Sequence, residues 1–502
     1  MERLQVADLL YLLPELTLVG TAILLTLLDL ILPNRFSRSI IGWLSIVGIV
    51  LSGIFVIAQM NPEAPIQLLN QSYRIDDFGN IIKLILLTGT ALIAFMSLGA
   101  IKKEEIPHIG EYYYFFLPAV LGGMIMASSG DLITLYVGLE LLSITSYLMV
   151  AMAKNKPQSN EGAFKYIVMG GISSAMILYG MSFLYGISGS TNLGQIAAAL
   201  AQGMESYEAL VYMSFFLLVA GFGFKIAAAP FHSWAPDVYQ GAPTPIAAFL
   251  AVISKAAGFA ILFRVFYTLF AFNTFQGVSS IQKDVFLTLS VLGAVAMVAG
   301  NFIALKQSNV KRLLAYSGIA NAGYLLVPLG VHHSLSHYGN FSEFIFYLIA
   351  YLFMNIGAFA ILMIMERSSG HTELSSFAGL YYRAPLTAVA MTLIVLSLAG
   401  IPISGGFFGK VYIILGAMST HSYWLGALMI GTSVVSFYYY FGIIRQMFMR
   451  SDREATEVKI SLPLGITMWI CALAGLALGC FPQLVLNYIE QIFSLTKDLI
   501  IM

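Results

Sequence analysis

The sequence predicts an all-α polytopic membrane protein with about fourteen transmembrane helices. Of its 502 residues, 59% are hydrophobic and only 10% are charged, and the mean hydropathy is +0.85. A soluble domain carries about 25% charged residues, and a β-barrel would alternate polar and apolar residues in short strands. The 25 basic and 25 acidic residues give zero net charge, and hence no attraction to nucleic acid. This composition excludes a soluble enzyme, a disordered chain and a nucleic-acid binder.

Fourteen apolar runs lie near the length of about 20 residues that spans a bilayer as a helix. The run that ends near residue 228 is followed by Pro230 and Pro236, and the long stretch 385–418 contains Pro402. Broken helices are tolerated in a membrane where they line a polar cavity, so the seventh and twelfth spans are predicted to be broken. The predicted spans are 10–31, 40–59, 78–100, 112–128, 131–152, 162–187, 208–228, 243–270, 285–305, 312–330, 342–365, 385–418, 423–449 and 460–482.

Basic residues predict the orientation, because Lys and Arg collect in cytoplasmic loops. They follow the odd-numbered spans, whereas the even-numbered loops offer only Arg74 and Lys283. Odd-numbered loops are therefore expected in the cytoplasm, with both termini outside. The first ten residues lack the basic region of a cleaved signal peptide, so the first run is expected to remain as a helix. The basic residues after odd-numbered spans are Arg35, Arg38, Lys102, Lys103, Lys154, Lys156, Lys165, Lys306, Lys311, Arg312, Arg367, Arg383, Arg450, Arg453 and Lys459.

The order of the spans suggests an internal duplication. Residues 112–270 and 285–449 each hold five predicted spans, and the fourth span of each unit is the broken one. Two copies of a unit with an odd number of spans must run in opposite senses, as in transporters built from inverted repeats. Residues 1–111 then form an N-terminal three-helix segment, and residues 450–502 form a C-terminal helix and tail.

Four ionisable residues lie deep in apolar runs, namely Glu140, Lys225, Lys255 and Lys410. A charge at the centre of a transmembrane helix costs about 3 kcal/mol, or about 12 kcal/mol for four unpaired charges. Such a cost is comparable to the whole stability of a typical protein. These residues therefore need partners, water or a function.

Glu140 follows Asp131 by nine residues, which places it about 14 Å into the membrane by helical rise. Tyr136, Ser143 and Tyr147 share its helical stripe, which can hold water and bond a carboxyl group. The alternative is a buried, protonated glutamic acid that bonds to a neighbouring helix.

Lys225 and Lys410 lie in the fourth span of their respective units, each beside glycine and proline. This correspondence favours a shared role, and the alternative for each is snorkelling to an interface. His232, seven residues after Lys225, is suited to pass a proton near neutral pH, although it also fits a packing role beside the break.

Lys255 shares its helical face with Ala251 and Gly258, so it is expected to face a packed neighbour rather than lipid. The alternative is a structural pair with a distant carboxylate.

The other charged residues, the cysteines and the outer-loop histidines are less informative about function. Lys83 and Arg264 lie near the outer ends of their spans and are expected to snorkel. The two cysteines, Cys471 and Cys480, are too few for an ordinary four-cysteine iron–sulfur cluster and are expected to be free thiols. The outer-loop histidines are expected to be solvated rather than to bind a metal; they are His332, His333 and His337.

Buried lysines and one carboxylate suit proton transfer, because desolvation lowers the proton affinity of a lysine and a nearby carboxylate restores it. A Glu140–Lys225 pair that forms and breaks would make Lys225 take up and release a proton, and Lys255 and then Lys410 would pass the change along. The sequence shows no redox or nucleotide site, so a partner subunit or an ion gradient is expected to drive the cycle.

The stretch FHSWAPDVYQGAPTP, which follows Lys225, closely resembles the antiporter-like membrane subunits of respiratory complex I. WAPDVYQGAPTP is similar to the N type rather than the L or M types. The chain also lacks the long C-terminal extension of the L type, and Lys410 stands where the M type usually has a glutamate. The resemblance covers residues 112–450, and the helix count extends it to both ends.

The resemblance implies a proton-translocating subunit of NADH–quinone oxidoreductase in a bacterial cell membrane. It implies that Glu140 pairs with Lys225, that Lys255 is the connecting lysine and Lys410 the terminal one, and that His232 belongs to the broken seventh helix. It implies no cofactor in this chain, with FMN, iron–sulfur clusters and quinone in other subunits. The implied partners are the lipid bilayer, the M-type subunit and the small K, J, A and H types.

Two other functions remain open from the sequence. One is a subunit of a multi-subunit cation/proton antiporter, which shares the fold. The other is a membrane scaffold in which the buried charges only hold helices together.

Overall fold

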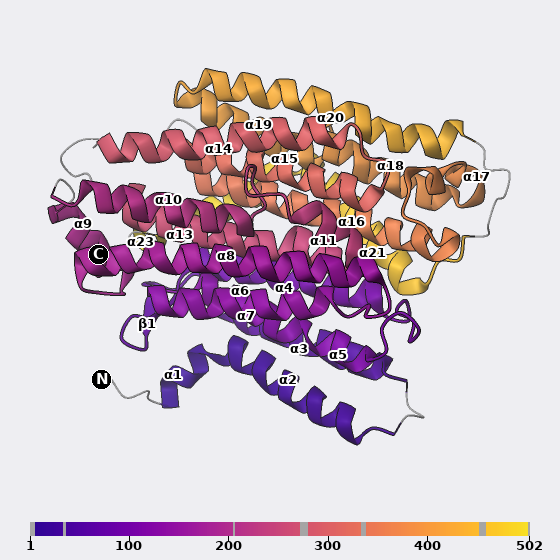
Figure 1. The fold of residues 1–502 in the computed structure, drawn as a ribbon, viewed down its shortest axis with the longest axis horizontal. Helices are drawn as coiled ribbons and strands as arrows, with labels where there is room; N and C mark the ends of the chain where they lie inside the picture. The colour runs from indigo at the N-terminus through magenta and orange to yellow at the C-terminus, as the bar shows by residue number, and fades with distance from the viewer. Residues whose placement is uncertain are drawn as a thin grey trace.

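The computed structural model describes residues 6–33, 37–203, 206–271, 280–332, 338–450 and 458–499. Its long helices lie side by side along one axis (Figure 1). Thirteen helical segments in these residues are long and apolar enough to cross a membrane. Two shorter apolar helices, Pro385–Ala399 and Gly405–Ser419, occupy the predicted twelfth span. The prediction of a polytopic helical membrane protein is confirmed.

The elements follow the predicted spans closely. The N-terminal segment holds α1 (Val6–Tyr11), α2 (Leu13–Ile31), α3 (Ser39–Ala58), β1 (Ile66–Leu68), β2 (Tyr73–Ile75) and α4 (Asp77–Ser97). The chain continues with α5 (Ile109–Tyr114), α6 (Phe116–Ala127), α7 (Leu132–Val150), α8 (Pro157–Ser188), α9 (Leu193–Gly203), α10 (Glu208–Lys225), α11 (Ala235–Gly241), α12 (Thr244–Phe249) and α13 (Lys255–Phe266), over the predicted first unit. Over the predicted second unit it forms α14 (Ser280–Ala304), α15 (Val310–Gly330), α16 (Asn340–Ser369), α17 (Leu380–Arg383), α18 (Pro385–Ala399), α19 (Gly405–Ser419) and α20 (Tyr423–Met449). The C-terminal part holds α21 (Leu462–Cys480), α22 (Pro482–Ile492) and α23 (Leu495–Asp498).

The two ends of the bundle carry different loops. The first and last helices, α1 and α23, lie at the same end as α9 and β1, whereas α5 and α17 lie at the opposite end (Figure 1). At the α5 end, ion pairs of 3.2 Å join Lys156 to Glu105 and Lys311 to Glu366. These pairs bring together basic loops that follow odd-numbered spans. Arg35 and Arg453 lie outside the described residues.

The seventh span is broken, as predicted. Helix α10 ends at Lys225, and the chain turns through residues 226–234 before α11 begins. Ala227 adopts a left-handed φ of 54° in this turn. The indole of Trp234 donates a 3.0 Å hydrogen bond to the carbonyl of Phe224, which also accepts a 3.0 Å bond from the amide of Ala227 in this turn. A side chain thus adds to the backbone bonding at the break, where backbone groups need partners inside the protein.

The twelfth span is broken at residues 400–404, between α18 and α19. Gly400 ends α18 with a φ of 85°, a conformation that favours glycine. Ser404 caps α19 by accepting a 3.3 Å hydrogen bond from the amide of Phe407. A Cβ atom on Gly406 would lie only 2.0 Å from the carbonyl oxygen of Ser397, so the two half-helices meet at a position that only glycine fits.

The eighth span, Thr244–Phe270, is the most enclosed of the thirteen long apolar helices among the described residues. Every residue of its most apolar stretch is buried inside the protein. It is helical throughout, but a π-helical turn over Leu250–Ser254 directly precedes Lys255. The extra residue of a π turn rotates the helix that follows and often marks functional sites. This turn was not predicted from the sequence.

Lys83 and Arg264 do not snorkel, so that prediction is wrong. Both side chains are fully buried. Lys83 Nζ lies 2.8 Å from Glu15 Oε1, and Arg264 forms two 2.9 Å hydrogen bonds to Asp76. Partners from distant parts of the chain, rather than the interface, neutralise these charges.

The reason is that the β1–β2 hairpin and the C-terminal segment cover this end of the bundle. Tyr73 in β2 donates a 2.6 Å hydrogen bond to Glu15, and Thr268 donates a 2.8 Å bond to the carbonyl of Leu499. Burial raises the pKa of Asp498 in α23 to about 6. Because the docked carboxyl group prefers its protonated form, docking of this segment strengthens as the pH falls through about 6.

We expect Lys83→Met to destabilise the protein by about 3–5 kcal/mol, because it leaves the Glu15 carboxylate buried without its cation. The double variant Lys83→Met/Glu15→Gln should lose much less, since no unpaired charge remains. The measurement is the temperature at which the subunit dissociates from its complex on native gels. Lys103→Met, at an exposed loop position, is the matched control. Equal losses in the single and double variants would contradict this account.

Candidate functional site

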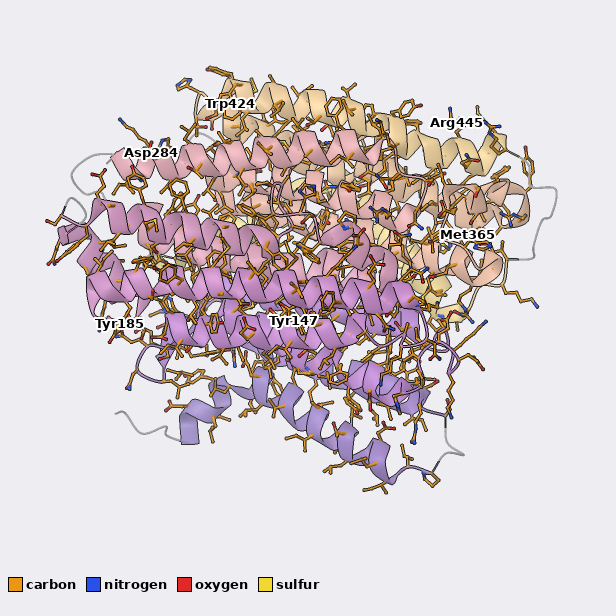
Figure 2. All side chains as sticks on the ribbon, in the orientation of Figure 1. Tyr147, Tyr185, Asp284, Met365, Trp424 and Arg445 are labelled. Atoms are coloured by element: carbon orange, nitrogen blue, oxygen red, sulfur yellow. The ribbon has the colours of Figure 1, made fainter. Side chains whose placement is uncertain are left out.

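Of the four charged residues singled out from the sequence, the three lysines are buried within the helical bundle and Glu140 is half-buried. The exposed fractions of Lys225, Lys255 and Lys410 are 5%, 2% and 5%, respectively. Figure 2 shows Tyr147, which lies one turn beyond Ser143 on α7, near the middle of the bundle's length. Buried ionisable groups inside a membrane bundle are characteristic of ion pathways.

Lys225 reaches the stripe of α7 that carries Glu140. Its ammonium donates a 2.5 Å hydrogen bond to Ser143 Oγ, one helical turn from Glu140, and the Glu140 charge attracts it. Glu140 Oε1 is buried, with no hydrogen-bond partner among the described residues. The lysine thus rests on a hydroxyl beside the carboxylate with which it was predicted to pair.

Helix α13 contacts Lys225 at Gly258, and Lys255 lies one helical turn before this glycine. A Cβ atom on Gly258 would lie 3.3 Å from the Cβ of Lys225, so the absence of a side chain there permits close approach. Gly258 follows Lys255 by three residues, a rise of about 4.5 Å. The face of α13 that carries Lys255 and was predicted to pack against a neighbour therefore packs against Lys225.

The Lys255 ammonium is buried, with no hydrogen-bond partner in the described part of the chain. A Cβ atom on Gly318 of α15 would lie 2.8 Å from Lys255 Nζ and 3.0 Å from the hydroxyl oxygen of Tyr351. The structural pair with a carboxylate, which was the alternative for Lys255, is not formed among the described residues. An unpaired buried cation needs a polar partner such as water.

His232 lies in the break of the seventh span and is half-buried. Its ring lies 6.3 Å from the ring of Tyr316, and the charge of Lys255 acts on it. Its Nδ1 atom has no hydrogen-bond partner in the described structure. His232 is therefore close enough to Lys255 to feel its charge, and its proton-carrying role stays a prediction.

A network of hydroxyl and amide groups lies between Lys255 and Lys410. Ser317, adjacent to Gly318, shares a hydrogen bond with the hydroxyl of Tyr440. Asn321 donates a 3.3 Å bond to Ser317 Oγ and accepts one from Tyr347. The Tyr347 ring in turn packs 6.5 Å from the ring of Tyr324.

Lys410 occupies the far end of this network, at the broken twelfth helix. Its ammonium donates hydrogen bonds of 3.1 and 3.2 Å to the carbonyls of Leu398 and Ala399, and it lies 5.0 Å from the centre of the Tyr324 ring. Free carbonyls at a helix C-terminus carry partial negative charge, and an aromatic face attracts cations. The break thus stabilises a buried charge without a carboxylate.

The network is the part of the site that the sequence analysis missed. A signal was available, because Ser317, Asn321 and Tyr324 recur at helical spacing on an otherwise apolar run. Glu343 was missed as well: it is only 1% exposed and packs against Gly416 of α19.

No group of three or more His, Cys, Asp or Glu residues among the described residues is placed to hold a metal ion. His333 and His337 lie outside those residues. Cys471 and Cys480 are free thiols, as expected.

The arrangement is that of an ion-conducting membrane protein: a broken-helix bundle with a row of buried, titratable groups. Residues 129–436 match the family described as the NADH:quinone oxidoreductase/Mrp antiporter membrane region. The chain is 52% identical to NADH-quinone oxidoreductase subunit N of Paenibacillus sp. strain JDR-2, with 98% of both chains covered. It is 51% identical to subunit N of Brevibacillus brevis, over 97% of this chain and 96% of that protein. The chain therefore belongs to the family of NADH-quinone oxidoreductase subunit N.

Solved structures agree with this assignment. A chain of respiratory complex I from Thermus thermophilus is 32% identical and superposes with a TM-score of 0.79, covering 94% of this chain and 98% of that one. A chain of the Mrp complex from Dietzia sp. DQ12-45-1b is 19% identical, with a TM-score of 0.80 and 95% of both chains covered. The second likeness shows the shared fold.

We expect Gly318→Ala to slow turnover of the complex by about tenfold or more, because the added methyl group would displace the Lys255 ammonium and the Tyr351 hydroxyl. Gly171→Ala on α8 is the matched control, since nothing lies within 4 Å of its Cβ position. The measurement is the rate of NADH oxidation in membranes with equal amounts of assembled complex. Similar rates in the two variants would show that the position of Lys255 is unimportant.

Proposed function

We propose that this chain is a proton-translocating membrane subunit of an NADH-quinone oxidoreductase. The observation that carries the proposal is the connected row of buried groups, in which Lys225 contacts the Glu140 stripe, Lys255 adjoins Lys225, and a hydroxyl network leads to Lys410. We infer the reaction, NADH–quinone oxidoreduction, from the names of the relatives. Electron transfer from NADH to quinone takes place in other subunits and drives this row.

The proton step at Lys225 is an exchange of partners. While Lys225 rests on Ser143, Glu140 lacks a cation, and movement of the ammonium by about one helical turn would form the ion pair. Formation of the pair favours the protonated lysine, and its loss in a dry interior favours release of the proton. Released protons pass to Lys255, with His232 beside it, and then through the hydroxyl network to Lys410.

We also propose how the chain is divided into units, how it is oriented in the membrane and which partners it has. Residues 112–270 and 285–449 are two inverted five-helix units, flanked by the N-terminal segment 1–111 and the C-terminal part 450–502. The chain crosses a bacterial cell membrane, with both termini outside and the α5 end in the cytoplasm. It holds no redox group; FMN, iron–sulfur clusters and quinone belong to other subunits. Its membrane partners are the M-type subunit and the small K, J, A and H types.

A subunit of a multi-subunit cation/proton antiporter is the second candidate. The matching family description includes Mrp antiporters, and the Mrp chain from Dietzia shares the fold. Relatives named NADH-quinone oxidoreductase subunit N over nearly the whole chain favour the first candidate.

The test is Lys225→Ala in membrane vesicles, with NADH oxidation and lumen acidification followed together after a native gel has shown assembly. We expect both rates to fall by about a hundredfold, as for the loss of a proton-transfer group. Lys154→Ala, in an exposed loop, should retain both rates. Unchanged oxidation and acidification in Lys225→Ala would remove this lysine from the mechanism and favour the antiporter or scaffold function. Acidification that requires sodium would also favour the antiporter.

Tyr440→Phe tests the network separately. It removes the hydroxyl that shares a hydrogen bond with Ser317, while keeping the ring. We expect turnover and acidification to fall together by several-fold, since removing one relay group costs less than removing a lysine. Tyr438→Phe, on the exposed face of the same helix, is the control and should leave both rates unchanged. If Tyr440→Phe keeps both rates, as its control does, the network is not part of the proton path.

A further inference from the structure

A cavity opens at the α5 end of the bundle, away from the row of buried lysines. Its volume is about 450 Å³. Its walls come from loops that follow the third, fifth, ninth and eleventh spans and from the start of the eighth span. Lys102, Glu105 and Arg367 are among its lining residues, and Glu366 and Lys311 reach it from α16 and α15.

Glu366, on α16, is held in this cavity by side chains of two other helices, α15 and α12. Lys311 Nζ lies 3.2 Å from Glu366 Oε1 and also donates a 3.2 Å hydrogen bond to the carbonyl of Ala242. The Thr244 hydroxyl, at the start of α12, donates to Glu366 Oε2. The Glu366 side chain is 27% exposed, whereas that of Lys311 is only 4% exposed. The carboxylate is thus the more exposed member of the pair, although both residues line the cavity.

We propose that Glu366 takes up protons from the cytoplasm through this cavity and passes them toward Lys255. The inference rests on the proposed function and its orientation, and it adds an uptake residue to the path. The Glu366 carboxylate accepts a proton from hydronium in the cavity and leaves water behind. Neutral Glu366 attracts Lys311 less, and the proton then moves inward through water to the Lys255 amine.

The groups between Glu366 and Lys255 support this direction. Along α16, Met363, Phe359, Asn355 and Tyr351 follow from Glu366 at intervals of three and four residues, which places them on one helical face. Met363 lines the cavity, and the Tyr351 hydroxyl adjoins the Gly318 position beside Lys255. One face of α16 thus runs from the cavity to the central lysine.

Two buried polar atoms lie along this course with no hydrogen-bond partner among the described residues, namely Asn355 Oδ1 and the Tyr239 hydroxyl. The Tyr239 ring packs 6.4 Å from that of Phe359, and the Tyr239 and Tyr351 hydroxyl groups interact electrostatically. An unsatisfied buried polar group costs about 1–3 kcal/mol, so such atoms are normally bonded to water. Water at these atoms would carry the proton past the apolar side chains.

The cavity is lined by charges of both signs. Lys156 is paired with Glu105, and Lys311 with Glu366, so two of the basic groups are already neutralised. Carboxylates that can accept protons therefore face the cavity together with cations; the carboxylates are Glu105, Glu366 and Glu373.

The test uses the complex in inverted membrane vesicles, whose outer surface is the cytoplasmic face. Glu366→Gln should lower NADH oxidation and lumen acidification together by about tenfold or more, and Glu366→Asp should restore most of both rates. Glu104→Gln is the matched control, because this carboxylate is exposed on the same face outside the cavity. If Glu366→Gln keeps full rates while Lys255→Ala loses them, the uptake residue lies elsewhere and the proposed function stands. If both variants keep full rates, both proposals fail.

A blocking experiment decides the case in which Glu366→Gln does not assemble. Ile101→Cys places a thiol in the cavity wall, and Lys154→Cys places one on the same face outside it. Both are made in a Cys480→Ser background, since Cys480 is exposed. A membrane-impermeant cationic methanethiosulfonate should inhibit oxidation in the Ile101→Cys complex and not in the Lys154→Cys complex. Full activity of the modified Ile101→Cys complex would overturn the proposal.

Discussion

The structure depends on one constraint, which is that a charge inside a membrane must meet a compensating group. The buried cations differ in how they meet it, and Lys255 has no hydrogen-bond partner among the described residues. Lys83 and Arg264 have carboxylates, Lys410 has the carbonyls of a broken helix, and Lys225 has a hydroxyl beside a carboxylate. The first two are tightly paired and hold helices together, whereas the last two have weaker partners that they can leave. A cation held by weak partners costs little to discharge, and this property suits proton transfer.

The helix breaks provide these weak partners. The break after α10 ends a helix at Lys225 and lets the chain turn toward His232, whereas the break after α18 exposes the carbonyls that Lys410 contacts. Pro230 and Gly400 carry the local reasons for the two breaks. At both breaks a side chain of the protein bonds to backbone carbonyls, so these carbonyls meet protein rather than lipid. The same sequence features thus create the break and the environment of the charge.

The sequence predicted the spans, the two breaks and the three buried lysines, because these features are local in the chain. It could not predict the partners. Tyr73 and Glu15 are 58 residues apart, and Arg264 and Asp76 are 188 residues apart, so neither pair leaves a local pattern. The β1–β2 hairpin is too short to produce a periodic signal, and the π turn before Lys255 arises from packing. Lys83 was therefore expected at an interface although it is buried.

The central claim is that Lys255 belongs to a hydrated path rather than to a structural ion pair. The most direct measurement is an electron cryo-microscopy map of the intact complex, at a resolution that shows ordered water. The account predicts water bonded to Lys255 Nζ, together with water at His232 Nδ1 or the Tyr351 hydroxyl. A map that shows Lys255 bonded to a carboxylate, with no water between it and the Ser317–Tyr440 pair, would contradict the account.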